Sequence, residues 1–210
     1  MARKELKRGI FITFEGVEGC GKSTHSRLLC DFLKGRGYSC FLTREPGGTK
    51  LGEEVRKILL HSDGIDISDL AELFLFEAAR AQIVGESIKP GLAAGKIVIC
   101  DRFSDATVCY QGYAGGVDLK AIETLNRVSS DGLKPDLTIL LDVDTAMGLR
   151  RAKSKGIDRM ERKKFAYHKR VRAGYLKLAK IYPKRIEVVK VAGTIKDTQT
   201  RVRREVERVI

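Results

Sequence analysis

The sequence of 210 residues has no apolar run approaching the ~18 residues that a membrane-spanning helix needs. Residues 1–8 are basic and residues 10–14 are apolar, as at the start of a signal peptide, but the apolar run stops at Glu15 and is too short for one. We therefore expect no membrane segment and, as the default, a cytoplasmic location. The sequence also has no internal repeat, linker or low-complexity segment, which favours a single domain over residues 1–210.

The sequence lacks paired cysteines. Its five cysteines are scattered, and none belongs to a C-x-x-C pair, so the pattern supports neither a zinc site nor a disulfide framework. Cys100 lies in an apolar segment and is expected to be a buried thiol.

Acidic residues are scarce relative to basic ones, with 27 Asp and Glu against 40 Lys and Arg, a net charge of +13. Such a surplus suits either nucleic-acid binding or an enzyme for small polyanionic nucleotides. The basic residues concentrate in residues 150–185 and 201–204, where most alternate with apolar residues at helical spacing, as on solvated helix faces. Because no RNA-recognition aromatic motif or zinc finger is present, we do not expect nucleic acid to be the main ligand.

What the sequence does contain is a phosphate-binding loop. Residues 16–24 contain the motif G-x-x-x-x-G-K-[ST], between an apolar segment at 10–14 and a helical pattern at 26–34. Gly16 and Gly21 permit a backbone whose N–H groups cradle phosphate, and a helix starting near Lys22 adds its positive end. Lys22 can reach the β- and γ-phosphates, and Ser23 can bind Mg²⁺. The expected ATP-binding residues are Gly16, Val17, Glu18, Gly19, Cys20, Gly21, Lys22, Ser23 and Thr24.

Apolar runs alternate with helical segments along the whole chain, which is typical of a parallel α/β sheet. Strands are expected at residues 10–14, 38–43, 97–100, 137–143 and 186–191. Helices are expected at 26–34, 50–61, 70–94, 119–129, from about 145, at 165–182 and at 198–210. Residues 150–159 are basic and contain Gly156, which predicts a mobile loop. The turns at 44–48 and 101–102 follow strands, at the sheet edge where such folds bind ligands.

A P-loop alone leaves several enzyme classes open. The N-K-x-D motif of GTPases is absent, and residues 140–144 are only a loose match to the acidic pair of helicases and motor ATPases. The short chain and the polar, basic ligand edge favour a nucleotide kinase, which holds a second phosphate-bearing ligand in line with ATP.

The motifs together resemble the bacterial thymidylate kinase family, whose members phosphorylate dTMP. Matching stretches occur nearly from end to end, at residues 14–24, 43–48 (Thr-Arg-Glu-Pro-Gly-Gly), 52–56, 76–80, 101–103, 110–112, 135–138, 158–161 and 168–175. The resemblance implies a three-layer P-loop nucleoside monophosphate kinase fold with a five-stranded parallel sheet and a lid at about residues 150–160. It also implies ATP and dTMP as substrates, Mg²⁺ as cofactor and a homodimer.

The resemblance assigns residues to the sugar, phosphate and metal. Glu18 matches the acidic residue that accepts the 3′-hydroxyl of dTMP. Arg56 and Arg102 match the arginines that hold its phosphate, a task suited to the bidentate guanidinium. Glu45 resembles a residue near the acceptor phosphate and metal. Asp101 could bond a water on Mg²⁺, and a structural ion pair with an arginine is an equal alternative.

Four further residues match the base pocket. Phe76 corresponds to a side chain that stacks on thymine, although core packing is an open alternative. Arg80, four residues later on the same helix face, corresponds to the residue that bonds the thymine carbonyl oxygen. Thr107 and Gln111 match positions that line the pocket.

The P-loop has Gly19 where part of the family has a catalytic arginine, so the chain resembles the class that supplies this charge from the lid. The lid candidates are Arg151, Lys153, Lys155 and Arg159, and we expect Arg159 first and Arg151 second. Lys22 and Arg102 complete the expected catalytic set. Two alternatives remain: another deoxynucleotide or nucleoside kinase, and a basic nucleic-acid-binding P-loop protein.

Overall fold

A five-stranded parallel sheet forms the centre of the structure, a computed structural model that describes residues 6, 8–61, 64–153 and 158–210. Its strands are β1 (Ile10–Glu15), β2 (Cys40–Arg44), β3 (Ile97–Asp101), β4 (Leu137–Asp142) and β5 (Ile186–Lys190). They lie in the order β2-β3-β1-β4-β5, and every neighbouring pair is parallel. The central strand β1 is buried along its whole length, which explains its largely apolar sequence.

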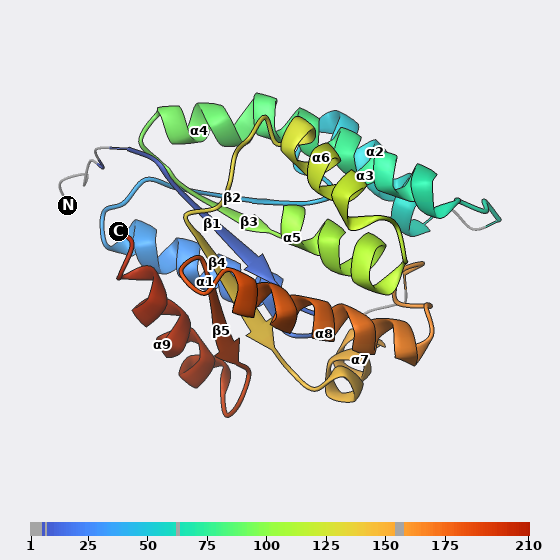
Figure 1. The fold of residues 1–210 in the computed structure, drawn as a ribbon. Coiled ribbons are helices and arrows are strands. Elements are labelled where there is room, and N and C mark those ends of the chain that lie inside the picture. The colour runs from blue at the N-terminus through green and yellow to red at the C-terminus, as the bar shows by residue number, and fades with distance from the viewer. Residues whose placement is uncertain (1–5, 7, 62–63, 154–157) are drawn as a thin grey trace.

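Helices cover both faces of this sheet. They are α1 (Lys22–Gly35), α2 (Lys50–His61), α3 (Asp69–Ile83), η1 (Val84–Ile88), α4 (Lys89–Ala93), α5 (Ser104–Thr107), η2 (Val108–Ala114), α6 (Leu119–Ser129), α7 (Thr145–Lys153), α8 (Phe165–Ile181) and α9 (Ile195–Val206). In the view of Figure 1, α3, α4 and α6 lie above the strands, whereas α9 lies to the left of β5 and α8 to its right. The expected α/β architecture is therefore confirmed. No helix in the described part of the chain has the length and apolar character needed to cross a bilayer.

The strand register brings three loops together at one edge of the sheet. Phe14 of β1 and Arg44 of β2 both pair with Asp101 of β3, so these strands end side by side. The P-loop after β1, the turn after β2 and Arg102 after β3 consequently meet at the carboxyl edge, where parallel α/β sheets bind ligands.

Three local expectations differ from the structure. The loop predicted at residues 150–159 is helical through Lys153, because Asp144 caps the amide groups of Ala146 and Met147 and good helix formers follow. Lys155 and Gly156 lie outside the described residues. The last helix starts at Ile195, where Thr194 and Asp197 form a capping box. The helices α5 and η2 were not predicted.

Candidate active site

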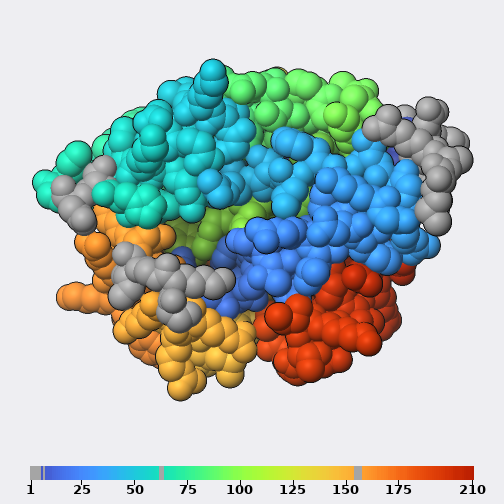
Figure 2. All heavy atoms as spheres, turned by 180° about the vertical axis from the view of Figure 1, so that it is seen from behind, coloured from blue at the N-terminus to red at the C-terminus, as the bar shows by residue number. Residues whose placement is uncertain are grey.

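A cleft of about 740 Å³ opens at this edge of the sheet. Its walls come from the P-loop and the start of α1, the turns after β2 and β3, the helices α2, α3, α5, η2 and α7, residues 158, 160 and 161, and the turn between β5 and α9. From behind the molecule, the P-loop region (blue) lies between the α2–α3 region (cyan) and the surfaces of α7 (yellow-orange) and α9 (red) (Figure 2). The structure thus places elements from both halves of the sequence around one cavity.

The P-loop carries its lysine folded into the loop. Lys22 Nζ donates to the carbonyl oxygens of Gly16 and Val17, each at 3.0 Å. Gly16 has a φ of 135°, and a Cβ there would lie 2.4 Å from the carbonyl oxygen of Leu141, so this position requires glycine. A phosphate entering the cradle would offer the ammonium stronger, charged acceptors in place of these carbonyls.

Ser23 and Asp101 lie together beside the loop. The Ser23 hydroxyl donates to Asp101 Oδ2 at 2.6 Å, and both side chains line the cleft. A hydroxyl and a carboxylate are oxygen ligands of the kind that Mg²⁺ prefers, and Mg²⁺ in phosphate sites usually has few protein ligands. Among the described residues, no group of three or more His, Cys, Asp or Glu is placed to hold a metal. These two residues therefore fit an ion that is carried mainly by nucleotide phosphates.

The carboxylate of Glu18 is buried and has several polar partners. Its Oε1 accepts from Tyr110 Oη and from Arg102 Nη2, the latter at 3.3 Å, and its Oε2 lies 3.2 Å from His168 Nδ1. Burial raises the pKa of Glu18, but the hydrogen bond to His168 and the charges of Arg102 and Lys22 outweigh it and hold the pKa at about 2. Glu18 is consequently an ionised acceptor beside the phosphate cradle.

Arg102 is held in place from several sides. Its Nη1 lies 3.2 Å from the Gly16 carbonyl oxygen and 3.3 Å from Tyr175 Oη, and its guanidinium lies 4.8 Å from the ring centroid of Tyr110. Its φ of 73° is left-handed, which is rare for a side chain other than Gly, Asn or Asp and is typical of functional sites. The structure thus brings Arg102 against the P-loop, at the edge of the sheet where the sequence predicts this residue to lie. Arg56 also lines the cleft, and its Nη1 donates to the Pro46 carbonyl at 2.9 Å.

Phe76, Arg80, Thr107 and Gln111 all line the cleft as well. Arg80 is only 2% exposed, and its Nη2 donates to Thr107 Oγ1 at 2.9 Å. Its Nη1 donates to Glu77 and Asn126, two partners that the sequence analysis missed. Their only sequence signal is the i, i+3 spacing of Glu77 and Arg80. Arg80 is therefore a fixed donor rather than a mobile surface cation.

Glu45 forms a buried ion pair with Arg80. Its Oε2 accepts from Arg80 Nε at 2.9 Å, while its buried Oε1 has no partner among the described residues. Burial raises the pKa of Glu45 to about 7, against the lowering effect of Arg80. Glu45 still lines the cleft, so its side chain can contact both Arg80 and a ligand.

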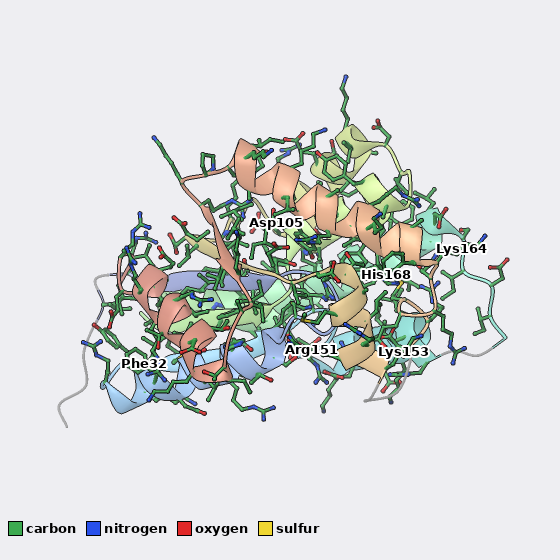
Figure 3. The ribbon with its side chains drawn as sticks, turned by 90° about the horizontal axis from the view of Figure 1, so that it is seen from below. Phe32, Asp105, Arg151, Lys153, Lys164 and His168 are labelled. Atoms are coloured by element: carbon green, nitrogen blue, oxygen red, sulfur yellow. The ribbon has the colours of Figure 1, made fainter. Side chains whose placement is uncertain are left out.

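The two arginines expected in the lid lie in different places. Arg151 on α7 lines the cleft, and in Figure 3 it lies on the side of α7 toward the P-loop, opposite Lys153. Arg159, the first choice from the sequence, instead donates through Nε to the Leu59 carbonyl at 2.7 Å, and its Nη2 forms an ion pair with Glu72. In this structure Arg159 is thus bound to α2 and α3 and does not line the cleft.

Two glycines seat α7 on the P-loop. A Cβ on Gly19, which has a φ of 65°, would lie 2.0 Å from the Gly148 carbonyl oxygen. A Cβ on Gly148 would lie 2.5 Å from the Glu18 carbonyl oxygen. An arginine at position 19 cannot be accommodated beside α7 in this arrangement, whereas Arg151, almost one turn after Gly148, is brought to the cleft.

Comparisons with known proteins agree with this geometry. The family model described as "Thymidylate kinase" matches residues 14–202. The chain is 46% identical to the thymidylate kinase of Desulfosudis oleivorans, over 95% of this chain and 97% of that protein. It is 45% identical to that of Geotalea uraniireducens, over 92% and 94% of the two chains. A crystal structure of thymidylate kinase from Ehrlichia chaffeensis superposes with a TM-score of 0.79 at 37% identity, covering 94% of this chain and 98% of that one.

The low pKa of Glu18 predicts a pH-dependent contribution to stability. The ordinary value is 4.5 and the folded value is about 2, so ionised Glu18 stabilises the fold above pH 4.5, and this contribution is lost as the pH falls through 2. Between pH 6 and pH 3, the free energy of unfolding of the wild type should fall by about 2 kcal/mol more than that of Glu18→Gln. Urea unfolding monitored across this range measures the difference. The exposed substitution Glu123→Gln is the control, and parallel curves for wild type and Glu18→Gln would contradict the assignment.

Proposed function

The chain belongs to the thymidylate kinase family, and we propose that its cleft transfers the γ-phosphoryl group of ATP to dTMP, giving dTDP and ADP. One observation supports this most strongly: a phosphate cradle, the ionised acceptor Glu18 and the pocket of Phe76 and Arg80 share a single cleft. A P-loop ATPase without an acceptor substrate needs only the first of these features.

ATP occupies the P-loop in this proposal. Its phosphates accept hydrogen bonds from the loop N–H groups and from the ammonium of Lys22. The ammonium then no longer donates to the carbonyl oxygens of Gly16 and Val17. Kinases of this family use ATP, typically with a divalent metal, and the oxygen ligands at Ser23 and Asp101 suit Mg²⁺. When bound, Mg²⁺ neutralises part of the phosphate charge.

The acceptor dTMP occupies the opposite end of the cleft. Phe76 stacks on thymine, and Arg80, already fixed by Glu45 and Glu77, donates to a base carbonyl from Nη2. Glu18 accepts a hydrogen bond from the sugar 3′-hydroxyl. This interaction explains why a carboxylate lies near phosphates of the same charge. Arg56 and Arg102 hold the acceptor phosphate, which is already anionic near neutral pH and needs no strong base as a nucleophile.

We assign the cation of phosphoryl transfer to Arg151 rather than Arg159. The transition state requires charge neutralisation more than covalent chemistry, so a guanidinium in the cleft suffices. Arg151 lines the cleft, and the contact between Gly19 and Gly148 holds its helix against the P-loop. Arg159 does not line the cleft, and its side chain contacts Glu72 and the Leu59 carbonyl instead.

Assay of the purified protein with ATP and separate monophosphates tests the function. We expect ADP formation with dTMP to exceed that with dCMP, dAMP and dGMP by orders of magnitude in kcat/KM. Activity with another monophosphate and none with dTMP would contradict the proposal. Activity with none of them, together with steeply salt-dependent DNA binding, would favour the nucleic-acid alternative.

Arg151→Ala should lower kcat by about 100-fold or more, because the variant loses a charge that acts mainly in the transition state. The KM for dTMP should change little. Lys153→Ala, on the opposite side of α7, is the matched control and should retain kcat within about threefold. Retained kcat in Arg151→Ala with loss in Arg159→Ala would restore the first choice made from the sequence.

We also propose a homodimer, formed through α2 and α3. These helices pack together and carry exposed apolar side chains, among them Ile58 at 40%, Leu70 at 54% and Phe74 at 51% exposure. An exposed apolar surface of this kind is typical of an interface. The remaining properties, a cytoplasmic location and a single domain, are proposed on the family's behaviour as soluble enzymes.

Sedimentation velocity should give twice the mass of one chain for the wild type. Phe74→Glu should yield monomers, because a charge would replace an apolar side chain at the interface. Ile195→Glu, at a position 60% exposed on α9, is the control and should remain dimeric. A monomeric wild type would refute the dimer without affecting the assignment of the reaction.

A further inference from the structure

A chain of polar side chains lies behind the base end of the cleft. Gln111 of η2 donates through Nε2 to Glu72 Oε1 of α3 at 2.9 Å. The other oxygen of Glu72 forms an ion pair with Arg159 Nη2. Glu72 is 2% and Gln111 is 3% exposed, so these contacts are shielded from water. None of them takes part in the phosphate chemistry described above.

Arg159 holds Glu72 rigidly. Its Nε donates to the Leu59 carbonyl at 2.7 Å, and its backbone N–H donates to the Leu60 carbonyl at 3.1 Å. The guanidinium is therefore fixed to the end of α2 while it pairs with Glu72 of α3. Glu72 cannot turn away from Gln111 without breaking the ion pair.

The ion-paired carboxylate determines which way the amide of Gln111 points. A carboxylate has only acceptor atoms, whereas an amide has one donor end and one acceptor end. Gln111 must therefore turn its NH₂ group toward Glu72, because the opposite orientation would set two acceptors against each other. Since Gln111 also lines the cleft, its carbonyl oxygen remains for whatever occupies the cleft.

We propose that Glu72 and Arg159 are positioning residues that set the base specificity of the kinase by fixing the amide of Gln111. This inference rests on the dTMP site proposed above. The pocket then presents a carbonyl acceptor from Gln111 and a guanidinium donor from Arg80. Thymine and uracil offer the complement, an N3–H donor beside a carbonyl oxygen, whereas cytosine offers an N3 acceptor beside an amino group. A cytosine base would leave buried polar groups of the pocket unpaired, which is a strong basis for rejection.

Glu72→Gln tests the proposal, because a neutral amide at position 72 can accept or donate and so allows Gln111 to turn over. We expect the KM for dTMP to rise about tenfold with kcat and the KM for ATP little changed. The kcat/KM ratio of dTMP to 5-methyl-dCMP, which keeps the thymine methyl group, should fall about tenfold. The ratio of dTMP to dUMP should not change, because both bases carry N3–H. A purely structural role would not separate these two ratios.

A double-mutant cycle shows whether Glu72 acts through Gln111. In a Gln111→Ala background, Glu72→Gln should have no further effect on either ratio. Arg159→Ala should also lower the kcat/KM ratio of dTMP to 5-methyl-dCMP and should retain kcat. It serves as the second variant if Glu72→Gln does not fold. Glu123→Gln, at an exposed position on α6, is the control.

Equal losses for dTMP, dUMP and 5-methyl-dCMP in Glu72→Gln, or a full effect in the Gln111→Ala background, would overturn the proposal. A wild-type protein that forms no ADP with dTMP would instead refute the proposed function, so the two failures are distinct.

Discussion

The arrangement of this site depends on the hydrogen bonds and ion pair of the buried Glu18 carboxylate. A buried charge is costly unless it is paired and hydrogen-bonded. Its partners come from three parts of the chain: Arg102 after β3, Tyr110 on η2 and His168 on α8. Satisfying Glu18 therefore fixes the P-loop, the end of the third strand and two helices relative to one another. The same contacts hold Glu18 where we propose that the sugar of the acceptor binds.

A second constraint is the close approach of the backbones of the P-loop and α7, which decides where the cleft can carry positive charge. Glycine at positions 19 and 148 lets α7 lie directly on the P-loop, and this contact leaves no room for a side chain at position 19. In the proposed mechanism, Arg151 on α7 supplies the cation that the loop lacks. Arg159 instead pairs with Glu72, and we propose that this ion pair supports the base pocket rather than the phosphates. The two arginines are close in sequence, but Arg151 lines the cleft and Arg159 does not.

Much of the fold follows from local sequence. Local patterns predict three features: the apolar run of β1, the glycines of the P-loop and the amphipathic helix α2. The helix α2 begins and ends where the sequence predicts. The π-helical η2 could not be predicted this way, because it packs against α8, whose residues lie far away in the sequence.

The candidate site shows the same division. Arg80 was expected at the cleft, but its partner Asn126 lies 46 positions away in the sequence. The place of Arg159 likewise depends on Glu72, 87 positions away. Such pairings are set by tertiary structure, and no spacing rule reports them.

A crystal structure with dTMP and a non-hydrolysable ATP analogue tests the central claim most directly. The claim is that one cleft holds both substrates, with Glu18 at the acceptor's sugar and Arg151 at the transferring phosphate. We predict the 3′-hydroxyl within hydrogen-bond distance of Glu18 and the guanidinium of Arg151 against the β- and γ-phosphate oxygens. Arg159 at those oxygens with Arg151 turned to solvent, or a monophosphate bound away from Glu18, would contradict the account.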